Sequence, residues 1–237
     1  RLVGSEMCIR DSQHTVTPND GMLEVKLECI RPDMEIHYTT DGSEPTATSP
    51  LYEKIVPVKE ALTLKGATFA YGRQMGKTLI LPVRWNLATA KPVLGTNPTE
   101  KLLTNGIRGS LKYSDFEWCS WADNDSVSFT IDLLKPEMLN TLTLGCITNN
   151  GMAIHKPASV RVEVSDDNSK FREAVVQSFT SEEIFREGNF IENLSLKLGG
   201  TQARYVRVTA KGPGVCPASH VRPGQTSRIF FDEVMLE

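Results

Sequence analysis

Two pairs of adjacent carboxylates, Asp166-Asp167 and Glu182-Glu183, are the residues whose type best suits acid–base chemistry. A glycosidase needs two carboxyl groups that face each other across the bond that is cleaved. Neighbouring residues on a strand or turn point away from each other, so neither pair meets that requirement. The sequence also has no GxSxG, no HExxH and no phosphate-binding glycine loop. We therefore expect no enzyme activity from the residues present.

Other side chains suit ligand binding. Recognition of a sugar ring needs an aromatic face and a few fixed hydrogen-bonding groups in loops at one end of a rigid scaffold. The polar loop EWCSWADND contains two tryptophans, and we expect Trp118 in the core and Trp121 at the ligand. The candidate hydrogen-bonding residues are Asn149, Asn150 and His155 in one loop, and His220 and Arg222 in the last long loop. They converge if both loops open at the same end, and otherwise they are solvated loop residues.

Alternation of apolar and polar residues predicts the strands that hold these loops. Leu23, Val25 and Leu27, for example, alternate with charged residues in a predicted strand over 23–29. Further strands are predicted at 35–39, 55–58, 62–69, 77–85, 126–133, 139–147, 159–165, 194–198, 204–210 and 228–236. No stretch has a sustained helical period, although residues 181–186 can form one helical turn. The predicted fold class is all-β, with antiparallel sandwiches.

The stretch ATAKPVLGTNPT concentrates Pro, Gly, Thr and Asn and predicts a linker. We expect a small unit at 13–88, a linker at 89–97 and a larger unit at 98–237. Residues 1–12, RLVGSEMCIRDS, resemble a translated sequencing adapter and are expected to be a non-native tail. Because the chain starts with Arg1 rather than Met, we expect it to be a piece of a longer protein.

The five cysteines form no CxxC pair, so we do not expect a zinc knuckle. Cys29 and Cys146 lie within apolar alternation and are predicted to be buried thiols. Cys119 and Cys216 lie in loops, and the sequence leaves open whether they form a disulfide.

The charge balance argues against two classes of partner. The chain has 26 Lys and Arg and 29 Asp and Glu, a formal net charge of −3. Nucleic-acid binding normally requires a basic excess, so we expect no nucleic acid. No apolar run approaches the roughly 18 residues of a membrane helix, so we expect no membrane insertion.

The first unit resembles a known domain family. The strings IHYTTDGSEPTATSPLYEK and LTLKGATFAYGRQMG resemble the chitobiase/β-hexosaminidase C-terminal domain, a small sandwich of the fibronectin type III or immunoglobulin kind. In that family the domain packs beside catalytic and binding domains or spaces them apart. The resemblance therefore implies a structural role and no active site for this unit.

The second unit resembles the coagulation factor V/VIII type C, or discoidin, domain. The resemblance rests on the Asn105-Gly106 turn before a tryptophan segment, on VRVEVSDDNSKF and on RYVRV near the end. It implies a galactose-binding-like jelly-roll sandwich, which in bacteria is largely a carbohydrate-binding module of family 32. Many relatives have a Trp in the loop that corresponds to 149–156, whereas this chain has Met152 and Ala153.

The same resemblance implies a structural calcium ion, and no other cofactor is expected. Relatives usually carry Asp-Gly where this chain has Asn105-Gly106. Asparagine still offers a neutral oxygen to a hard cation. The expected ligands are Asn105, Ser110 and Glu233, and the alternative is a plain turn beside a surface carboxylate.

The order of the two domains, with GVCPASHVRPGQTSRIFFDEV near the end, looks like the C-terminal region of glycoside hydrolase family 20 enzymes of Bacteroidetes, the β-N-acetylhexosaminidases. It implies a non-catalytic fragment that binds glycan and packs against its own upstream catalytic domain. The implied ligand is a glycan with terminal GlcNAc, GalNAc or galactose. The implied location is periplasmic, outer-membrane-associated or secreted.

Three alternatives remain from the sequence. The chain can be a structural spacer without a ligand, or the tail of another exo-glycosidase such as an α-L-fucosidase. Membrane binding, as in animal discoidin domains, requires apolar loop tips beside basic residues, and the loop 149–156 supplies only Met152 and Ile154.

Overall fold

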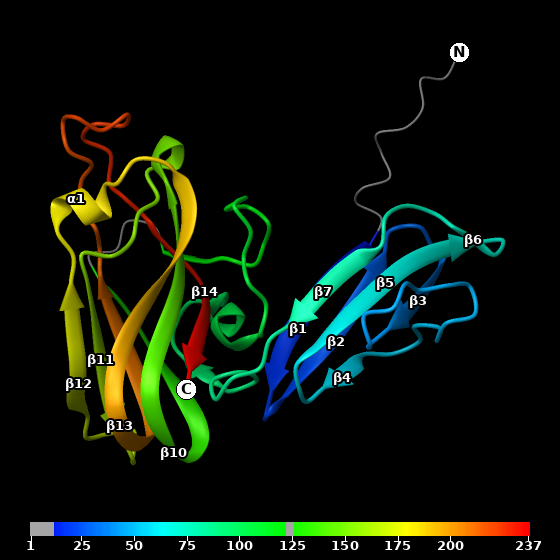
Figure 1. Cartoon of the computed structure of the whole chain (residues 1–237), viewed down its shortest axis with the longest axis horizontal. Helices are drawn as coiled ribbons and strands as arrows, with labels where there is room; N and C mark the ends of the chain where they lie inside the picture. The colour runs from blue at the N-terminus through cyan, green and yellow to red at the C-terminus, as the bar shows by residue number, and fades with distance from the viewer. Residues whose placement is uncertain (1–11, 122–125) are drawn as a thin grey trace. The chain divides into compact units, whose positions relative to one another are not determined.

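The computed structural model describes residues 12–121 and 126–237 and divides into two compact units, Arg1–Trp85 and Asn86–Glu237 (Figure 1). The paired strands of both units are antiparallel, which confirms the all-β prediction. The predicted tail, residues 1–12, lies outside the described residues apart from Ser12, which begins β1.

The first unit consists of two small sheets. One has the order β1-β2-β4, and in the other β5 pairs with β3, β6 and β7. The strands are β1 Ser12–Asn19, β2 Met22–Cys29, β3 Glu35–Thr39, β4 Val56–Val58, β5 Leu62–Ala70, β6 Arg73–Gln74 and β7 Leu79–Val83.

Local sequence explains the first hairpin. Asp20 and Gly21 have positive φ angles of 42° and 88°, which a two-residue turn between antiparallel strands requires. In β2 the predicted inward residues Leu23, Val25 and Leu27 are buried, whereas the residues between them are not. The alternation therefore reports which face of this strand meets the core.

A long two-stranded ribbon forms the frame of the second unit. β10 (Ser126–Asn149) pairs with β13 (Asn189–Lys211) along most of its length. The register shifts between Asp132 and Glu137, and Leu134 between them has a positive φ of 70°, so the ribbon bends there. The sequence predicts each of these long strands as two shorter ones, at 126–133 and 139–147 for β10 and at 194–198 and 204–210 for β13.

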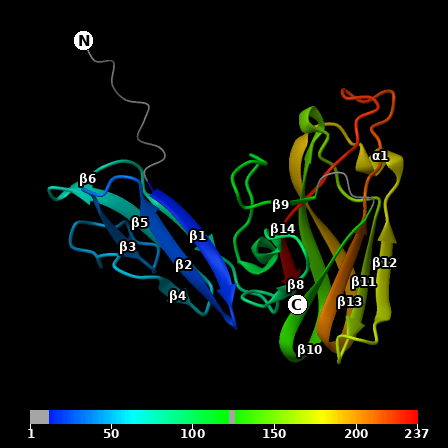
Figure 2. The same ribbon diagram turned by 180° about the vertical axis from the view of Figure 1, so that it is seen from behind.

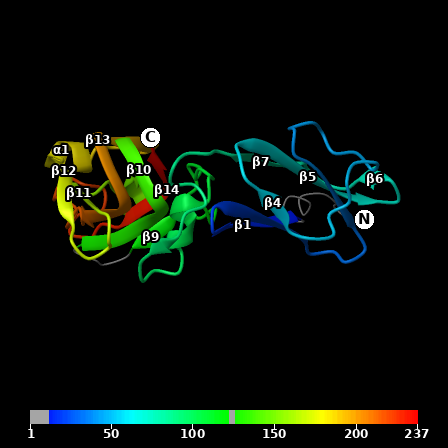
Figure 3. The same cartoon turned by 90° about the horizontal axis from the view of Figure 1, so that it is seen from below.

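The other strands extend this ribbon in the order β12-β11-β13-β10-β14-β9, with β8 added to β10 (Figure 2). β11 pairs with the second half of β13, whereas β14 pairs with the second half of β10, so the bent ribbon contributes to two layers. Figure 3 shows these strands nearly end-on. Their bounds are β8 Val93–Leu94, β9 Cys119–Trp121, β11 Ser159–Ser165, β12 Arg172–Ser178 and β14 Ile229–Leu236.

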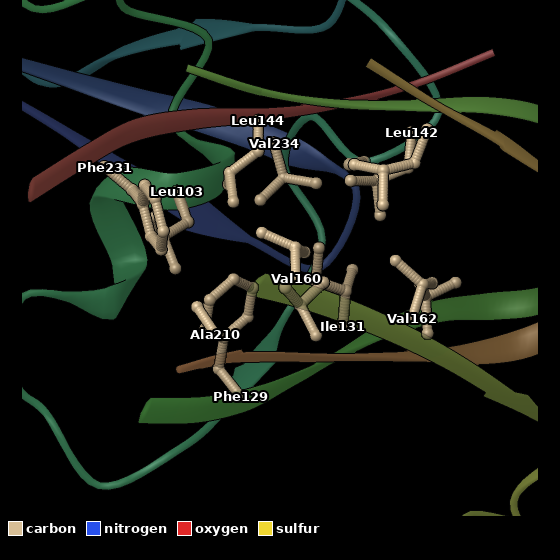
Figure 4. Packing of buried hydrophobic residues seen from close by; sticks show 14 of the residues in the cluster. Leu103, Phe129, Ile131, Leu142, Leu144, Val160, Val162, Ala210, Phe231 and Val234 are labelled. Carbon is tan, nitrogen blue, oxygen red and sulfur yellow. The ribbon is translucent and has the colours of Figure 1, made fainter. Parts of the chain in front are cut away.

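The core of the second unit lies between the two layers (Figure 4). The eight side chains named in the next sentence and labelled in the figure are each at most 1% exposed. One layer supplies Leu142, Leu144, Phe231 and Val234, and the other supplies Phe129, Ile131, Val160 and Val162. Burial of one such side chain stabilises the fold by roughly 1.5–3 kcal/mol, so this double row holds the loops on a rigid support.

The stretch predicted as a linker, residues 89–97, belongs to the second unit. Ala90 is completely buried, and its N–H donates to the Thr104 carbonyl at the end of η1 (Glu100–Thr104) over 2.8 Å. Val93 pairs with Ile131 in the β8–β10 ladder. The stretch 89–97 is therefore part of the folded second unit. Its Pro and Gly content suggested a linker, because composition does not show that Ala90 is buried in the fold.

The α1 helix, Ser181–Ile184, confirms the predicted helical turn. Thr180 Oγ1 accepts a bond from the Glu183 N–H, and the Thr180 N–H donates to Glu183 Oε2 over 2.7 Å. This capping box satisfies two free N–H groups at the helix start. Among the described residues, no helix has the length and apolar character that crossing a membrane requires.

Candidate functional site

Three segments of the second unit meet at one end of its strands (Figures 1 and 2). The first contains the short η2 helix (Asn150–Met152) after β10, the second contains α1, and the third connects β13 to β14. We call residues 149–156, 181–188 and 212–228 together the loop end. The two loops that carry the predicted hydrogen-bonding residues therefore open on the same side.

Asn149 and Asn150 are fixed by their own loop. The side chain of Asn149 accepts a bond from the Met152 N–H and so caps η2. Asn150 is buried, and its Oδ1 accepts a 2.9 Å bond from the Gly188 N–H. Its Nδ2 lies 3.3 Å from Nε2 of His220. Asn150 therefore ties together all three segments of the loop end.

The loop 212–228 folds back on itself through backbone hydrogen bonds. The Cys216 N–H donates to the Gln225 carbonyl, and the Gly224 N–H donates to the Cys216 carbonyl. Inside this loop Nδ1 of His220 accepts a 3.0 Å bond from the Arg222 N–H. A neutral imidazole has one acceptor nitrogen, so a neutral His220 satisfies either Arg222 or Asn150 and not both.

His155 is completely buried at the centre of the loop end. Its ring centroid lies 4.9 Å from that of His220 and 5.0 Å from that of Phe185, both edge to face. Burial, reinforced by the neighbouring His220, lowers the pKa of His155 to about 4, although a backbone group of Ile184 opposes the shift. Neither ring nitrogen of His155 has a hydrogen bond of normal geometry. A neutral imidazole is thus buried without a hydrogen bond of normal geometry.

Arg222 is the exposed member of the predicted set. Its backbone N–H donates to His220, and the residue is exposed to solvent. The structure therefore brings Asn150, His155 and His220 together and places Arg222 next to them, while Asn149 serves as a helix cap.

Trp121 lies in the core, contrary to the prediction that it touches a ligand. It is 8% exposed, stacks on Phe129 with a centroid distance of 6.1 Å, and meets Phe231 edge to face. In β9 the inward residues Cys119 and Trp121 alternate with the exposed Ser120, a signal that the sequence carries. Trp121 is inward because β9 pairs with β14 and so completes the layer.

Trp118 is buried as predicted, in a smaller cluster that includes Ile147, Ile154 and Phe230. Its indole N–H donates to the Ser110 carbonyl over 3.1 Å. Neither tryptophan therefore offers an open ring face to a sugar.

Two phenylalanines, Phe185 and Phe116, are candidates for the aromatic ring that contacts a sugar, and the sequence reasoning missed both. Phe185 is partly exposed, directly follows α1 and contacts both histidine rings of the loop end. Phe116 is 88% exposed and has a positive φ of 71°, which is rare for a bulky residue. Phe185 could have been found from its place within the predicted helical turn at 181–186, whereas nothing in the sequence marks Phe116 as exposed.

Of the expected calcium ligands, Glu233 fits a cation best. Its Oε2 accepts a 3.0 Å bond from the Gly106 N–H, and its buried Oε1 has no hydrogen bond of normal geometry, although the Asn86 side chain acts on this carboxylate. Burial and the nearby Asp232 raise the pKa of Glu233 well above its ordinary value. A cation at Oε1 would supply the missing partner and favour the charged form.

The other two expected ligands, Asn105 and Ser110, already use their oxygen atoms in hydrogen bonds. Asn105 Oδ1 accepts a bond from the Ile107 N–H, and its Nδ2 donates to Glu117. One lone pair of Oδ1 stays open to a cation, one residue from the Gly106 contact. Ser110 is exposed, and its hydroxyl accepts a bond from the Lys112 N–H. The residues present therefore offer a cation one oxygen of Glu233 and one lone pair of Asn105, and the full ligand set, with Ser110, stays a prediction.

The four described cysteines are free thiols. Cys146 is completely buried, as predicted, whereas Cys29 is only partly buried because it ends β2. Cys119 lies in β9 and Cys216 lies in the loop end, and both are buried without a disulfide.

Three solved structures similar to this chain are less than 20% identical to it. CpGH89CBM32-6 of Clostridium perfringens has 18% identity and a TM-score of 0.42, covering 65% of this chain and 98% of its own. A fucose-binding module of Streptococcus pneumoniae has 18% identity and a TM-score of 0.40, covering 65% and 97%. The C-terminal domain of a chitobiase from Bacteroides fragilis has 16% identity and a TM-score of 0.33, covering 55% and 76%.

Comparison with curated proteins gives no significant match. Two protein-family models do match. The model of the chitobiase/beta-hexosaminidase C-terminal domain matches residues 18–79, within the first unit. The model of the F5/8 type C domain matches residues 88–221, within the second unit. Since this second match covers more than half of the 237 residues and agrees with the all-β fold, the chain belongs to the F5/8 type C domain family.

Proposed function

We propose that the second unit binds glycan through its loop end and that the chain is the non-catalytic accessory part of a glycoside hydrolase. The observation that carries the proposal is the meeting of two loops distant in sequence, in which Asn150 Nδ2 lies 3.3 Å from Nε2 of His220. Binding loops on a rigid sandwich are the usual position for such a site.

The surface around that contact has the groups that a sugar requires. Phe185 supplies a partly exposed aromatic ring, and the exposed Arg186 and Arg222 supply hydrogen-bond donors from the segments that carry Phe185 and His220. In this proposal Phe185 takes the part that the sequence assigned to Trp121. The buried Asn150 and His220 hold the loops in place rather than reach the sugar themselves.

The first unit supports a proposal for the parent enzyme. The match of residues 18–79 to a chitobiase/beta-hexosaminidase C-terminal domain supports a β-N-acetylhexosaminidase of family 20 as the parent, and the order of the two domains is the ground for proposing a member of the Bacteroidetes. We accordingly propose terminal GlcNAc, GalNAc or galactose as the ligand and an upstream catalytic domain as the packing partner. A module of this kind raises the local concentration of substrate near the enzyme. Its site of action would be the periplasm, the outer membrane or the medium.

A spacer without ligand is the second candidate. One observation favours it: Asn150, His155 and His220 are all buried, so fewer of the predicted groups reach the surface. The tail of an α-L-fucosidase is the alternative parent.

Titration of the whole chain with methyl glycosides of GlcNAc, GalNAc and galactose, followed by calorimetry, tests the site. We expect Arg222→Ala and Phe185→Ala to weaken binding at least about tenfold, which is about 1.4 kcal/mol. Arg73→Ala, an exposed arginine of β6 in the first unit, is the matched control. Equal binding by all of these variants would place the site elsewhere.

We also propose a structural calcium ion held by Glu233 and Asn105, with Ser110 as a further ligand. When bound, the ion would supply positive charge to the buried Glu233 carboxylate and tie the 105–106 turn to β14. We expect Ca²⁺ to raise the melting temperature of the wild-type chain relative to a chelator, and Glu233→Gln to abolish the difference. The same melting temperature with Ca²⁺ and with chelator would contradict the proposal.

A further inference from the structure

Three buried side chains of the loop end could act together as ligands. The ligand atoms of His155, Cys216 and His220, one ring nitrogen from each histidine and the Cys216 sulfur, all lie within 4.8 Å of one another. Within 12–121 and 126–237, no other group of three or more His, Cys, Asp or Glu side chains is found in such an arrangement.

Burial makes this arrangement unusual. The three residues are 0%, 2% and 8% exposed in the order His155, Cys216 and His220. Both nitrogens of His155 lack a hydrogen bond of normal geometry, and a buried polar group without a partner costs free energy. The Cys216 sulfur has one polar neighbour, the Ser227 hydroxyl at 3.4 Å. A bound ion would give these groups the partner that the protein does not.

The donor set selects the class of ion. Two imidazole nitrogens and one thiolate suit Zn²⁺ and similar transition metals, whereas Ca²⁺ and Mg²⁺ prefer oxygen. Three residues separate Cys216 from His220, which is within the short spacing of zinc ligands. The sequence reasoning, which found no CxxC pair and expected no zinc knuckle, missed this Cys/His pair. His155 comes from a different loop, which makes the site a cross-link.

The distances are close to those of a tetrahedral site. Zn–N bonds of about 2.1 Å and Zn–S bonds of about 2.3 Å place ligand atoms about 3.5 Å apart. The present upper limit of 4.8 Å therefore requires the loops to close by about 1 Å. Binding through either nitrogen of His220 also requires its contact with Asn150 or Arg222 to open.

We propose that His155, Cys216 and His220 form a zinc site that fastens the loop 212–228 to the loop after β10. On binding, the Cys216 S–H bond breaks, its proton goes to solvent, and the sulfur coordinates the ion. Three protein ligands leave the fourth position to a water molecule. The site stabilises the loop end whether or not a glycan binds there.

The test uses the whole chain with Cys8→Ser, because Cys8 lies outside the described residues. A chelator-treated sample is titrated with Co²⁺, which reports a thiolate ligand by a charge-transfer band in the near ultraviolet. We expect one equivalent of Co²⁺ to give that band and Zn²⁺ to remove it. Cys216→Ser and His155→Gln should lose the band, whereas Cys29→Ser, a partly buried thiol of the first unit, should keep it.

A second measurement needs no variant of the three ligands. Zn²⁺ should slow the alkylation of Cys216 at a denaturant concentration that begins to expose this buried thiol, as peptide mass spectrometry would show, and a chelator should reverse the protection. The proposal is overturned if the folded chain gives no charge-transfer band, or if the band persists in Cys216→Ser. Glycan binding is measured separately, so the failure of either proposal is recognised independently of the other.

Discussion

The side-chain amide of Asn150 lies 3.3 Å from Nε2 of His220 and so joins the loop after β10 to the loop after β13. The oxygen of the same side-chain amide accepts a bond from the Gly188 N–H and so also holds the segment after α1. The ribbon of β10 and β13 has Asn149 opposite Asn189 at one end and Ser126 opposite Lys211 at the other, and its bend at Leu134 brings these two ends to the same side of the sandwich. A site built there is positioned by the core rather than by the loops themselves.

Trp121→Ala should lower the free energy of unfolding of the second unit and should not remove a direct contact with a ligand. The ring packs on Phe129 and Phe231, and removal of a buried tryptophan costs about 3–5 kcal/mol. Denaturant unfolding of the whole chain measures this loss. Phe116→Ala, which removes an 88% exposed ring, is the control and should change stability by less than about 0.5 kcal/mol. A stable Trp121→Ala chain with weakened glycan binding would return Trp121 to the ligand site.

Gly109→Ala should destabilise the fold because the added Cβ would overlap the indole of Trp118. Such overpacking costs roughly 1–3 kcal/mol. If the overlap is the cause, Trp118→Leu in the same chain should reduce the cost of the alanine, which a double-mutant cycle measures by denaturant unfolding. Additive effects of the two substitutions would disprove the contact.

The ion pair of Asp132 and Arg204 should make the stability of the second unit depend on pH in the acid range. Arg204 donates two bonds of 2.8 and 2.9 Å to the carboxylate and holds the pKa of Asp132 below its ordinary value of 3.8. A carboxylate with a lowered pKa stabilises the fold above pH 3.8, and this stability is lost as the pH falls through the folded-state value.

Asp132→Asn should therefore be less stable than the wild type at neutral pH, with a difference that shrinks as the pH falls below about 4. Melting temperatures from pH 7 to pH 2 measure this, with Asp166→Asn as an exposed control. A difference that stays constant down to pH 2 would show that the ion pair does not govern the effect.

The thiols should differ in reactivity. Burial raises the pKa of Cys119 to about 12 and also raises the pKa of Cys146. Since the thiolate is the reactive form, both should resist iodoacetamide until the chain unfolds, whereas the partly buried Cys29 should react earlier. Peptide mass spectrometry distinguishes the positions. Equal labelling of Cys146 and Cys29 in the native chain would contradict the burial of Cys146 in the core.

Much of the fold was readable because burial leaves a periodic trace. Leu23, Val25 and Leu27 predict the inward face of β2, and Thr180 to Glu183 explains where α1 begins. The bend at Leu134 carries no such trace, because its positive φ follows from the pairing of β10 with β13. The sequence therefore predicts two strands where the structure has one bent strand.

The site was predictable only in part. Loop position was enough to group Asn150, His155 and His220, but it does not tell whether a polar side chain turns inward. Trp121 was assigned to the ligand because its neighbours are polar, although Cys119 and Trp121 share the alternation of a strand. Cys216 was not linked to His155 because that contact depends on how distant loops meet.

The most direct test of the glycan-binding account is equilibrium titration of the unmodified whole chain with GlcNAc-, GalNAc- and galactose-terminated oligosaccharides. The account predicts saturable binding to at least one of them, with Kd at about the millimolar level or tighter. No binding to any of the three by the folded chain would contradict it and would leave the spacer role.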